Sequence, residues 1–155
     1  SAGNAKADVP LSVSLDLPQF RKGFYRVVNG VWERTQSSVC ANEAGTRNGV
    51  LESGEDLDTD GRLEPGRSDV TVRLVQPRTR ADGTAIVEIT YAKSFATWVD
   101  AWITVAASGV AGTEGRATFV LPPVPTTAAS LADVDAAPAF QFSPYGLNPT
   151  CTDPE

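Results

Sequence analysis

The feature that most constrains this chain is a series of short runs in which apolar and polar residues alternate. Successive side chains of a β-strand point to opposite faces of a sheet, so such runs predict strands with one buried face. No segment has a convincing helical period. We therefore expect an all-β fold, an antiparallel immunoglobulin-like β-sandwich of about seven strands. The β-prone runs are residues 9–17, 24–28, 31–34, 70–74, 85–91, 98–107 and 117–121.

Turn residues indicate how some of these runs are paired. Asn29-Gly30 lies between two β-prone runs, and this dipeptide favours a tight hairpin turn because both residues tolerate positive φ. Residues 81–83 (Ala-Asp-Gly) predict a second turn, which would pair the run at 70–74 with the run at 85–91. Pro10 has no backbone N–H to donate, which predicts an edge position for the first strand.

Composition excludes several classes of function. The chain has 155 residues, which is one domain's length, and a net charge of −6 with no histidine. Nucleic-acid binding needs a basic patch, so nucleic acid is not expected as a partner. No apolar run approaches the ~20 residues that cross a bilayer, so membrane insertion is not expected either. Without histidine there is no Ser-His or Cys-His pair, and we expect no catalytic residues and no enzyme activity.

The predicted domain organisation is a β-sandwich over residues 1–121 followed by a tail. From Pro122 onward the chain is rich in alanine and proline and has no period. Such a segment cannot join a central strand. We expect residues 122–155 to form a tail that wraps the outside of the same domain in extended form or is partly mobile.

Two cysteines suggest how that tail is held. A disulfide between Cys40 and Cys151 would fasten the C-terminus to the domain, whereas the alternative is a pair of free buried thiols. Disulfides persist in oxidising compartments. Together with the low lysine content and the Thr/Ser/Gly-rich β pattern, this predicts an exported protein: extracellular, on the cell surface or periplasmic.

The acidic residues are concentrated in one segment, which we expect to be a loop inserted at residues 42–67. Residues 42–69 contain eight acidic and three basic residues, a net charge of −5. The segment also repeats itself, because residues 48–54 (NGVLESG) recur as residues 60–66 (DGRLEPG) at an offset of 12. Twelve is the length of the EF-hand calcium loop, which places ligands at positions 1, 3, 5, 7, 9 and 12 and glycine at position 6.

The second copy of the repeat fits the first five ligand positions. Gly61 falls at position 6, but position 12 is Arg67, which cannot replace the usual glutamate. The expected ligands at positions 1, 3, 5, 7 (through its carbonyl) and 9 are Asp56, Asp58, Asp60, Arg62 and Glu64.

The first copy has the opposite defect. Asn48, Glu52 and Glu55 occupy positions 5, 9 and 12, but positions 1 and 3 are weak, and Asn42 or Glu43 is the candidate to reach in instead. All these donors are hard oxygens, which favours Ca²⁺ over zinc or copper. The alternative is a solvated acidic loop in which Asp and Gly serve only as turn formers.

Two motifs resemble known families. Residues 56–61 (DLDTDG) resemble the calcium loops of thrombospondin type 3 repeats and dockerins. Residues 79–90 (TRADGTAIVEIT) are similar to the core of bacterial Ig-like domains of the invasin/intimin type, and this resemblance extends over residues 69–121. It implies a structural or adhesive module of a bacterial surface protein, with a protein or glycan partner. No dockerin helices are evident, so cohesin binding is not implied.

Two other functions stay open. Trp98 and Trp102 share one face by alternation, and if that face is exposed they could stack on sugar rings as a carbohydrate-binding module. The alternative is that both faces of this strand are covered. A third interpretation is an extracellular filament subunit that self-associates by strand addition.

Overall fold

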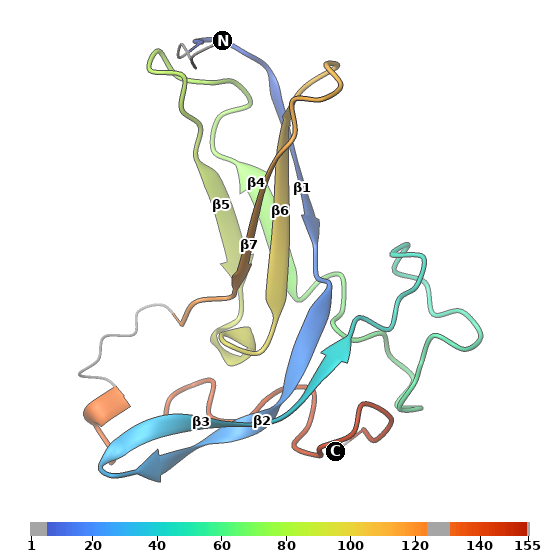
Figure 1. The fold of residues 1–155 in the computed structure, drawn as a ribbon, viewed down its shortest axis with the longest axis vertical. Helices are drawn as coiled ribbons and strands as arrows, with labels where there is room; N and C mark the ends of the chain where they lie inside the picture. Colours follow the sequence, from blue (N-terminus) through green and yellow to red (C-terminus); the bar gives the residue numbers. More distant parts are fainter. Residues whose placement is uncertain (1–5, 124–130, 155) are drawn as a thin grey trace.

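A computed structural model describes residues 6–123 and 131–154, and within them the chain is all-β (Figure 1). Seven strands form three small antiparallel sheets, and one short 3-10 helix (η1, Lys93–Phe95) precedes β6. The prediction of an antiparallel all-β fold is confirmed. The strands are β1 (Leu11–Asp16), β2 (Gln19–Val28), β3 (Val31–Ala41), β4 (Val70–Leu74), β5 (Val87–Tyr91), β6 (Asp100–Ala107) and β7 (Gly115–Val120).

Five strands run along the long axis of the molecule (Figure 1). One sheet has the order β1-β6-β7, and the other pairs β4 with β5 in the predicted hairpin. The segment around Pro10 links the two sheets, because Leu11 N–H donates to the Pro77 carbonyl (2.8 Å) and Thr79 N–H donates to the Val9 carbonyl (3.0 Å). β1 is thus the edge strand of its own sheet, as Pro10 predicts, and its N-terminal end borders the other.

The β2–β3 hairpin crosses the base of these sheets (Figure 1). Its turn is the predicted one, with φ of 50° at Asn29 and 80° at Gly30. Both strands are longer than predicted, and their register shifts between Lys22 and Gly23, which marks a β-bulge. Gly23 has a φ of 144°, which only glycine adopts readily.

Residues 140–146 of the C-terminal tail pack on the domain and contribute side chains to its core. They cover the free edge of β2: Tyr25 N–H donates to the Gln141 carbonyl (2.7 Å), and Gly23 N–H donates to the Gly146 carbonyl (3.0 Å). Residues 124–130 and 155 of the predicted tail lie outside the described residues. Its aromatic residues Phe140 and Tyr145 are 7% and 3% exposed.

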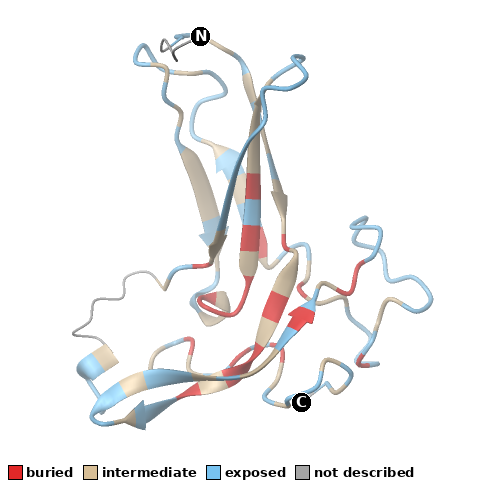
Figure 2. Cartoon of the chain, viewed as in Figure 1, coloured by how far each residue is buried: buried red, intermediate tan, exposed pale blue. Residues whose placement is uncertain are grey.

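Buried residues concentrate where the hairpin, the tail and the start of β6 meet (Figure 2). Tyr25 packs edge-on against Trp98 and Phe140, with ring centroids 5.7 and 5.1 Å apart, and Phe20 lies 4.8 Å from Tyr145. The core cluster comprises Leu17, Phe20, Tyr25, Cys40, Val70, Ala96, Trp98, Val99, Ala101, Leu121, Phe140 and Tyr145.

The predicted disulfide is present. Cys40, at the end of β3, is bonded to Cys151, with the two Cα atoms 5.5 Å apart. The bond encloses the acidic loop and most of the domain in one covalent ring. Among the described residues, no helix is long and apolar enough to cross a membrane.

We expect Phe140→Ala to destabilise the domain by about 3–5 kcal/mol, because the ring leaves a cavity in the core. Chemical denaturation measures the loss. Leu147→Ala is the matched control, since Leu147 lies in the same tail but is 44% exposed. Equal effects of the two variants would contradict the role assigned to the tail.

Reduction of the disulfide should also destabilise the protein. The two cysteines are 111 residues apart, and closing a loop of that size stabilises by up to about 4–5 kcal/mol in the chain-entropy model. We expect the Cys40→Ser/Cys151→Ser double variant to melt at a lower temperature than the oxidised protein. Two freely alkylated thiols in the unreduced protein would refute the bond.

Candidate metal site

The acidic loop joins β3 to β4 and projects from the side of the molecule (Figure 1). Asn42 fixes its first residues, because the Asn42 side chain donates to the Leu17 carbonyl (2.7 Å) and accepts from Ala44 N–H (2.8 Å). The loop then folds back, so that Glu43 N–H donates to the Glu64 carbonyl (2.9 Å). The two ends of the loop are therefore held side by side.

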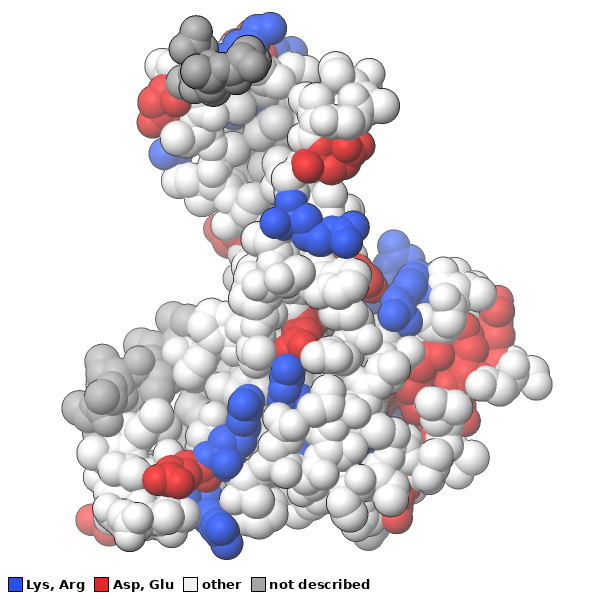
Figure 3. All heavy atoms as spheres, in the orientation of Figure 1, with Lys and Arg blue, Asp and Glu red and all other residues white. Residues whose placement is uncertain are grey.

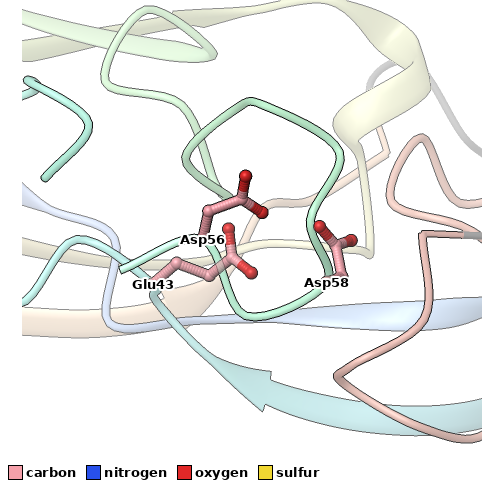
Figure 4. Close-up of side chains that lie close together, drawn as sticks. All are labelled: Glu43, Asp56 and Asp58. Carbon is pink, nitrogen blue, oxygen red and sulfur yellow. The ribbon is translucent and has the colours of Figure 1, made fainter. Parts of the chain in front are cut away.

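Three carboxylates converge inside this loop (Figure 4). One oxygen from each of Glu43, Asp56 and Asp58 lies within 4.8 Å of the others. Glu43 and Asp58 are 6% and 3% exposed. Oxygen ligands about 2.3–2.6 Å from one calcium ion can be no more than about 5 Å apart, so these three groups could hold a single ion.

The backbone of the second copy of the repeat wraps around its own carboxylates. Asp56 accepts from the N–H groups of Asp60 (3.1 Å) and Gly61 (2.9 Å), and Asp58 also accepts from Asp60 (3.2 Å). Asp60 in turn accepts from Arg62 N–H (2.7 Å). Gly61 has a φ of 86°, which explains why glycine stands at the sharpest point of the turn.

Glu43 closes this loop from outside the repeat. Its two carboxylate oxygens accept from Leu57 N–H (3.1 Å) and Glu64 N–H (3.0 Å). Glu43 was a candidate for the first copy, but the structure places it with Asp56 and Asp58 of the second. It thus supplies a glutamate to the copy whose position 12 is Arg67, and sequence spacing alone could not show this because Glu43 precedes both repeats.

Glu64 is the least satisfied member of the group. One of its carboxylate oxygens is buried without a hydrogen-bond partner among the described residues. Burial, and after it the charges of Asp58, Asp60 and Glu43, raise the pKa of Glu64 to about 8. Burial likewise raises the pKa of Glu43 and of Asp58. Clustering acidic groups out of water therefore disfavours their charged forms unless a cation is near.

A buried lysine partly offsets this charge from the side of β2. Lys22 is 1% exposed, and its ammonium donates to the Asp153 carbonyl in the tail. Its positive charge lowers the pKa values of Asp58 and Glu64, although burial outweighs it in both. The loop, the hairpin and the C-terminus thus meet around one buried set of charges.

In the first copy, hydrogen bonds link the expected ligands to one another and to the backbone of the loop. Asn48 donates to Glu52 through its side-chain amide (2.9 Å), and Glu55 accepts from Thr46 N–H (3.1 Å) and Glu52 N–H (3.2 Å). Asn48 and Glu52 are exposed. Their oxygens therefore hold the turns of the loop, which is the behaviour expected of turn formers.

The two tryptophans do not form a shared platform. The strand predicted from residue 98 begins at Asp100, and Trp98 is fully buried, where its indole N–H donates to the Phe140 carbonyl (2.9 Å). Trp102 is 37% exposed on β6, with the Arg116 guanidinium 5.1 Å from its ring centroid. The prediction that both could stack on a sugar is wrong for Trp98.

Charged side chains on the visible face are unevenly distributed (Figure 3). Acidic residues gather on the projecting loop, while lysine and arginine form a separate stripe over the lower part of the molecule. Comparisons of this chain with protein-family models, curated proteins and solved structures found no match.

The raised pKa values give a direction for the pH dependence of stability without metal. Glu64 titrates near 8 in the folded protein and near its ordinary 4.5 when unfolded, so the folded state binds the proton more tightly. In chelator, the free energy of unfolding should be highest below about pH 4.5 and should fall as the pH rises to 8. The difference between the two pKa values corresponds to about 5 kcal/mol, and solvent screening of this half-buried group reduces the expected fall to roughly 2–3 kcal/mol.

Urea denaturation at several pH values measures this fall, and Glu64→Gln should flatten it. Glu52→Gln is the matched control, because Glu52 is exposed in the first copy and should leave the slope unchanged. Stability that stays level with pH in chelator would contradict the buried carboxylate cluster.

Proposed function

We propose that this chain is a calcium-stabilised Ig-like module of a bacterial secreted or cell-surface protein, with a structural or adhesive function. The observation that carries the proposal is the convergence of Glu43, Asp56 and Asp58 on one point inside a loop of net charge −5. Nothing in this arrangement suggests catalysis, and the chain has no histidine.

Calcium is the ion that best suits these donors. The cluster offers only carboxylate oxygens, with the orphaned Glu64 oxygen nearby and backbone carbonyls and water available to fill six to eight positions. Zinc and copper prefer nitrogen or sulfur donors, and both cysteines are bonded to each other. Magnesium requires a rigid octahedron and keeps its water, which a turn-rich loop serves less well.

A structural role follows from where the loop is attached. Its ends lie against the β1–β2 junction and close to Lys22, so an ion in the loop would fix residues that border the core. The disulfide supports export, since such bonds persist in oxidising compartments. Two antiparallel sheets linked through residues 8–11 and 77–79 are consistent with an Ig-like sandwich of the invasin/intimin type.

Carbohydrate binding is less well supported. It would depend on Trp102 alone, because Trp98 is buried. The Arg116 guanidinium lies over the Trp102 ring, where a sugar would have to stack. The structural function is therefore our conclusion.

Calcium should raise the melting temperature of the protein, and chelator should lower it. A ligand that binds only the folded state stabilises by about 2.7 kcal/mol at 100 times its dissociation constant, which is a shift of several degrees for a domain of this size. Asp58→Asn should remove most of the shift, because Asp58 is buried in the cluster and the neutral amide is a weaker ligand.

Two further variants distinguish the copies of the repeat. Glu43→Gln should weaken calcium binding in a titration calorimeter, whereas Glu55→Gln in the first copy should leave it nearly unchanged. Magnesium at the same concentration should shift the melting temperature less than calcium. An identical melting temperature in calcium and in chelator would overturn the proposal.

A further inference from the structure

A cavity of about 130 Å³ lies between the end of β1 and the acidic loop, apart from the carboxylate cluster. Its walls combine two kinds of side chain. Leu15, Leu17, Leu63 and Pro65 give an apolar surface, and Arg47 and Arg67 line the same cavity. Several water molecules would fit into such a volume, but it is smaller than the sites that take drug-sized molecules.

The charge of this cavity is opposite to that of its surroundings. It is lined by two arginines and one acidic residue, Asp16, within a protein of net charge −6 and beside a loop of net charge −5. Asp16 pairs with Arg47 (3.1 Å), whereas Arg67 has no carboxylate partner among the described residues, so the lining has one positive charge in excess. This favours an anionic ligand of low charge.

Arg47 is held in a strained conformation at the cavity wall. Its φ of 57° lies in the left-handed region, which a residue other than glycine adopts at a cost. Its Nε donates to Asp16 (3.1 Å), and its Nη1 donates to the carbonyls of Asn42 (3.3 Å) and Ala44. Arg47 thus already binds one carboxylate, and among the described residues its Nη2 group donates to no acceptor.

Arg67 approaches from the other side of the loop. Its Nη1 donates to the Asn48 carbonyl (3.2 Å), while its Nε and Nη2 have no acceptor among the described residues. The side chain crosses Gly49, where a Cβ atom would lie only 3.2 Å from the Arg67 Cδ. Glycine at this position, which also lines the cavity, therefore permits the close passage of the Arg67 side chain.

We propose that this cavity binds a small aliphatic carboxylate, whether as a free acid or as the C-terminal residue of a peptide. The free Nε and Nη2 groups of Arg67 form a planar donor edge that matches a carboxylate, Arg47 can add only its Nη2 group, and the leucine walls match a short branched chain. Inorganic phosphate or sulfate fits less well, because it carries more charge than the lining balances and leaves the apolar wall uncovered. This proposal does not depend on the metal site, although both use the same loop.

Amide chemical shifts during titration with isovalerate test the proposal, with separate samples in calcium and in chelator. We expect saturable shifts at Ala44, Gly49 and Leu63 with a dissociation constant on the order of millimolar, as suits so small a ligand. Isovaleramide, which lacks the charge, should cause none of them. A capped peptide ending in valine, with its C-terminal amide as control, shows whether a chain terminus can enter.

Arg67→Gln should weaken isovalerate binding at least about tenfold, because a charge-assisted hydrogen bond is lost. Arg67→Lys keeps the positive charge but not the planar guanidinium group. Its affinity for isovalerate should therefore lie between that of Arg67→Gln and that of the unaltered protein. Arg62→Gln is the matched control: it removes the same charge from the same loop, but Arg62 does not line the cavity. Thermal melts confirm that each variant is folded.

Non-saturating shifts, shifts of equal size with isovaleramide, or unchanged binding in Arg67→Gln would each overturn the proposal. Binding of isovalerate without any calcium-dependent melting would leave this inference standing while removing the proposed metal site. Calcium-dependent melting without isovalerate binding would do the reverse.

Discussion

The order of the acidic loop depends on the hydrogen bonds that the Glu43 side chain accepts. A single carboxylate accepts from the backbone at Leu57 and at Glu64, and so joins the entrance of the loop to the turns that carry Asp56 and Asp58. Burying it is unfavourable unless it is paired or neutralised. The same burial that positions the group therefore makes the loop sensitive to protons and cations, since both relieve the same repulsion.

This local constraint is connected to the rest of the fold through β2. Lys22 extends from β2 toward the loop and binds the Asp153 carbonyl, and the neighbouring Cys40–Cys151 bond keeps that segment in place. Residues 141–146 cover the edge of β2 that does not pair with β3, and the aromatic residues of this tail complete the core. Loop, strand and tail are thus mutually dependent, although they are far apart in sequence.

Much of this architecture could be predicted from local patterns. Alternation located the strands, and Asn29-Gly30 located the hairpin, because both signals depend on neighbouring residues alone. With only two cysteines, the alternatives were a single bond or two free thiols, and the structure shows the bond. The burial of Trp98 was harder to predict. Strict alternation would place Trp98 and Trp102 on the same face of a strand. The strand begins only after Trp98, however, and the preceding turn directs the Trp98 ring into the core.

The candidate metal site, like the fold, was predictable where it depends on residues close together in sequence. The spacing of Asp56 and Asp58 within the repeat predicts that they act together, and the structure brings them together. Glu43 joins them only because the chain folds back between β3 and β4, which no local period encodes. Phe140 and Tyr145 were missed for a similar reason, since an irregular segment buries side chains without a repeating pattern.

The bulge opposite Gly23 affects the outer edge of β3. Alternate residues of β2 donate their N–H groups to the tail and to Trp98, so they do not hydrogen-bond to β3. The β3 residues paired with them direct their own backbone groups away from β2. These outward-facing residues are Trp32 and Arg34 before the bulge and Val39 after it. A regular incoming strand would match one half of this edge and be out of phase with the other. The irregularity therefore works against fibril-like stacking of the longest strand.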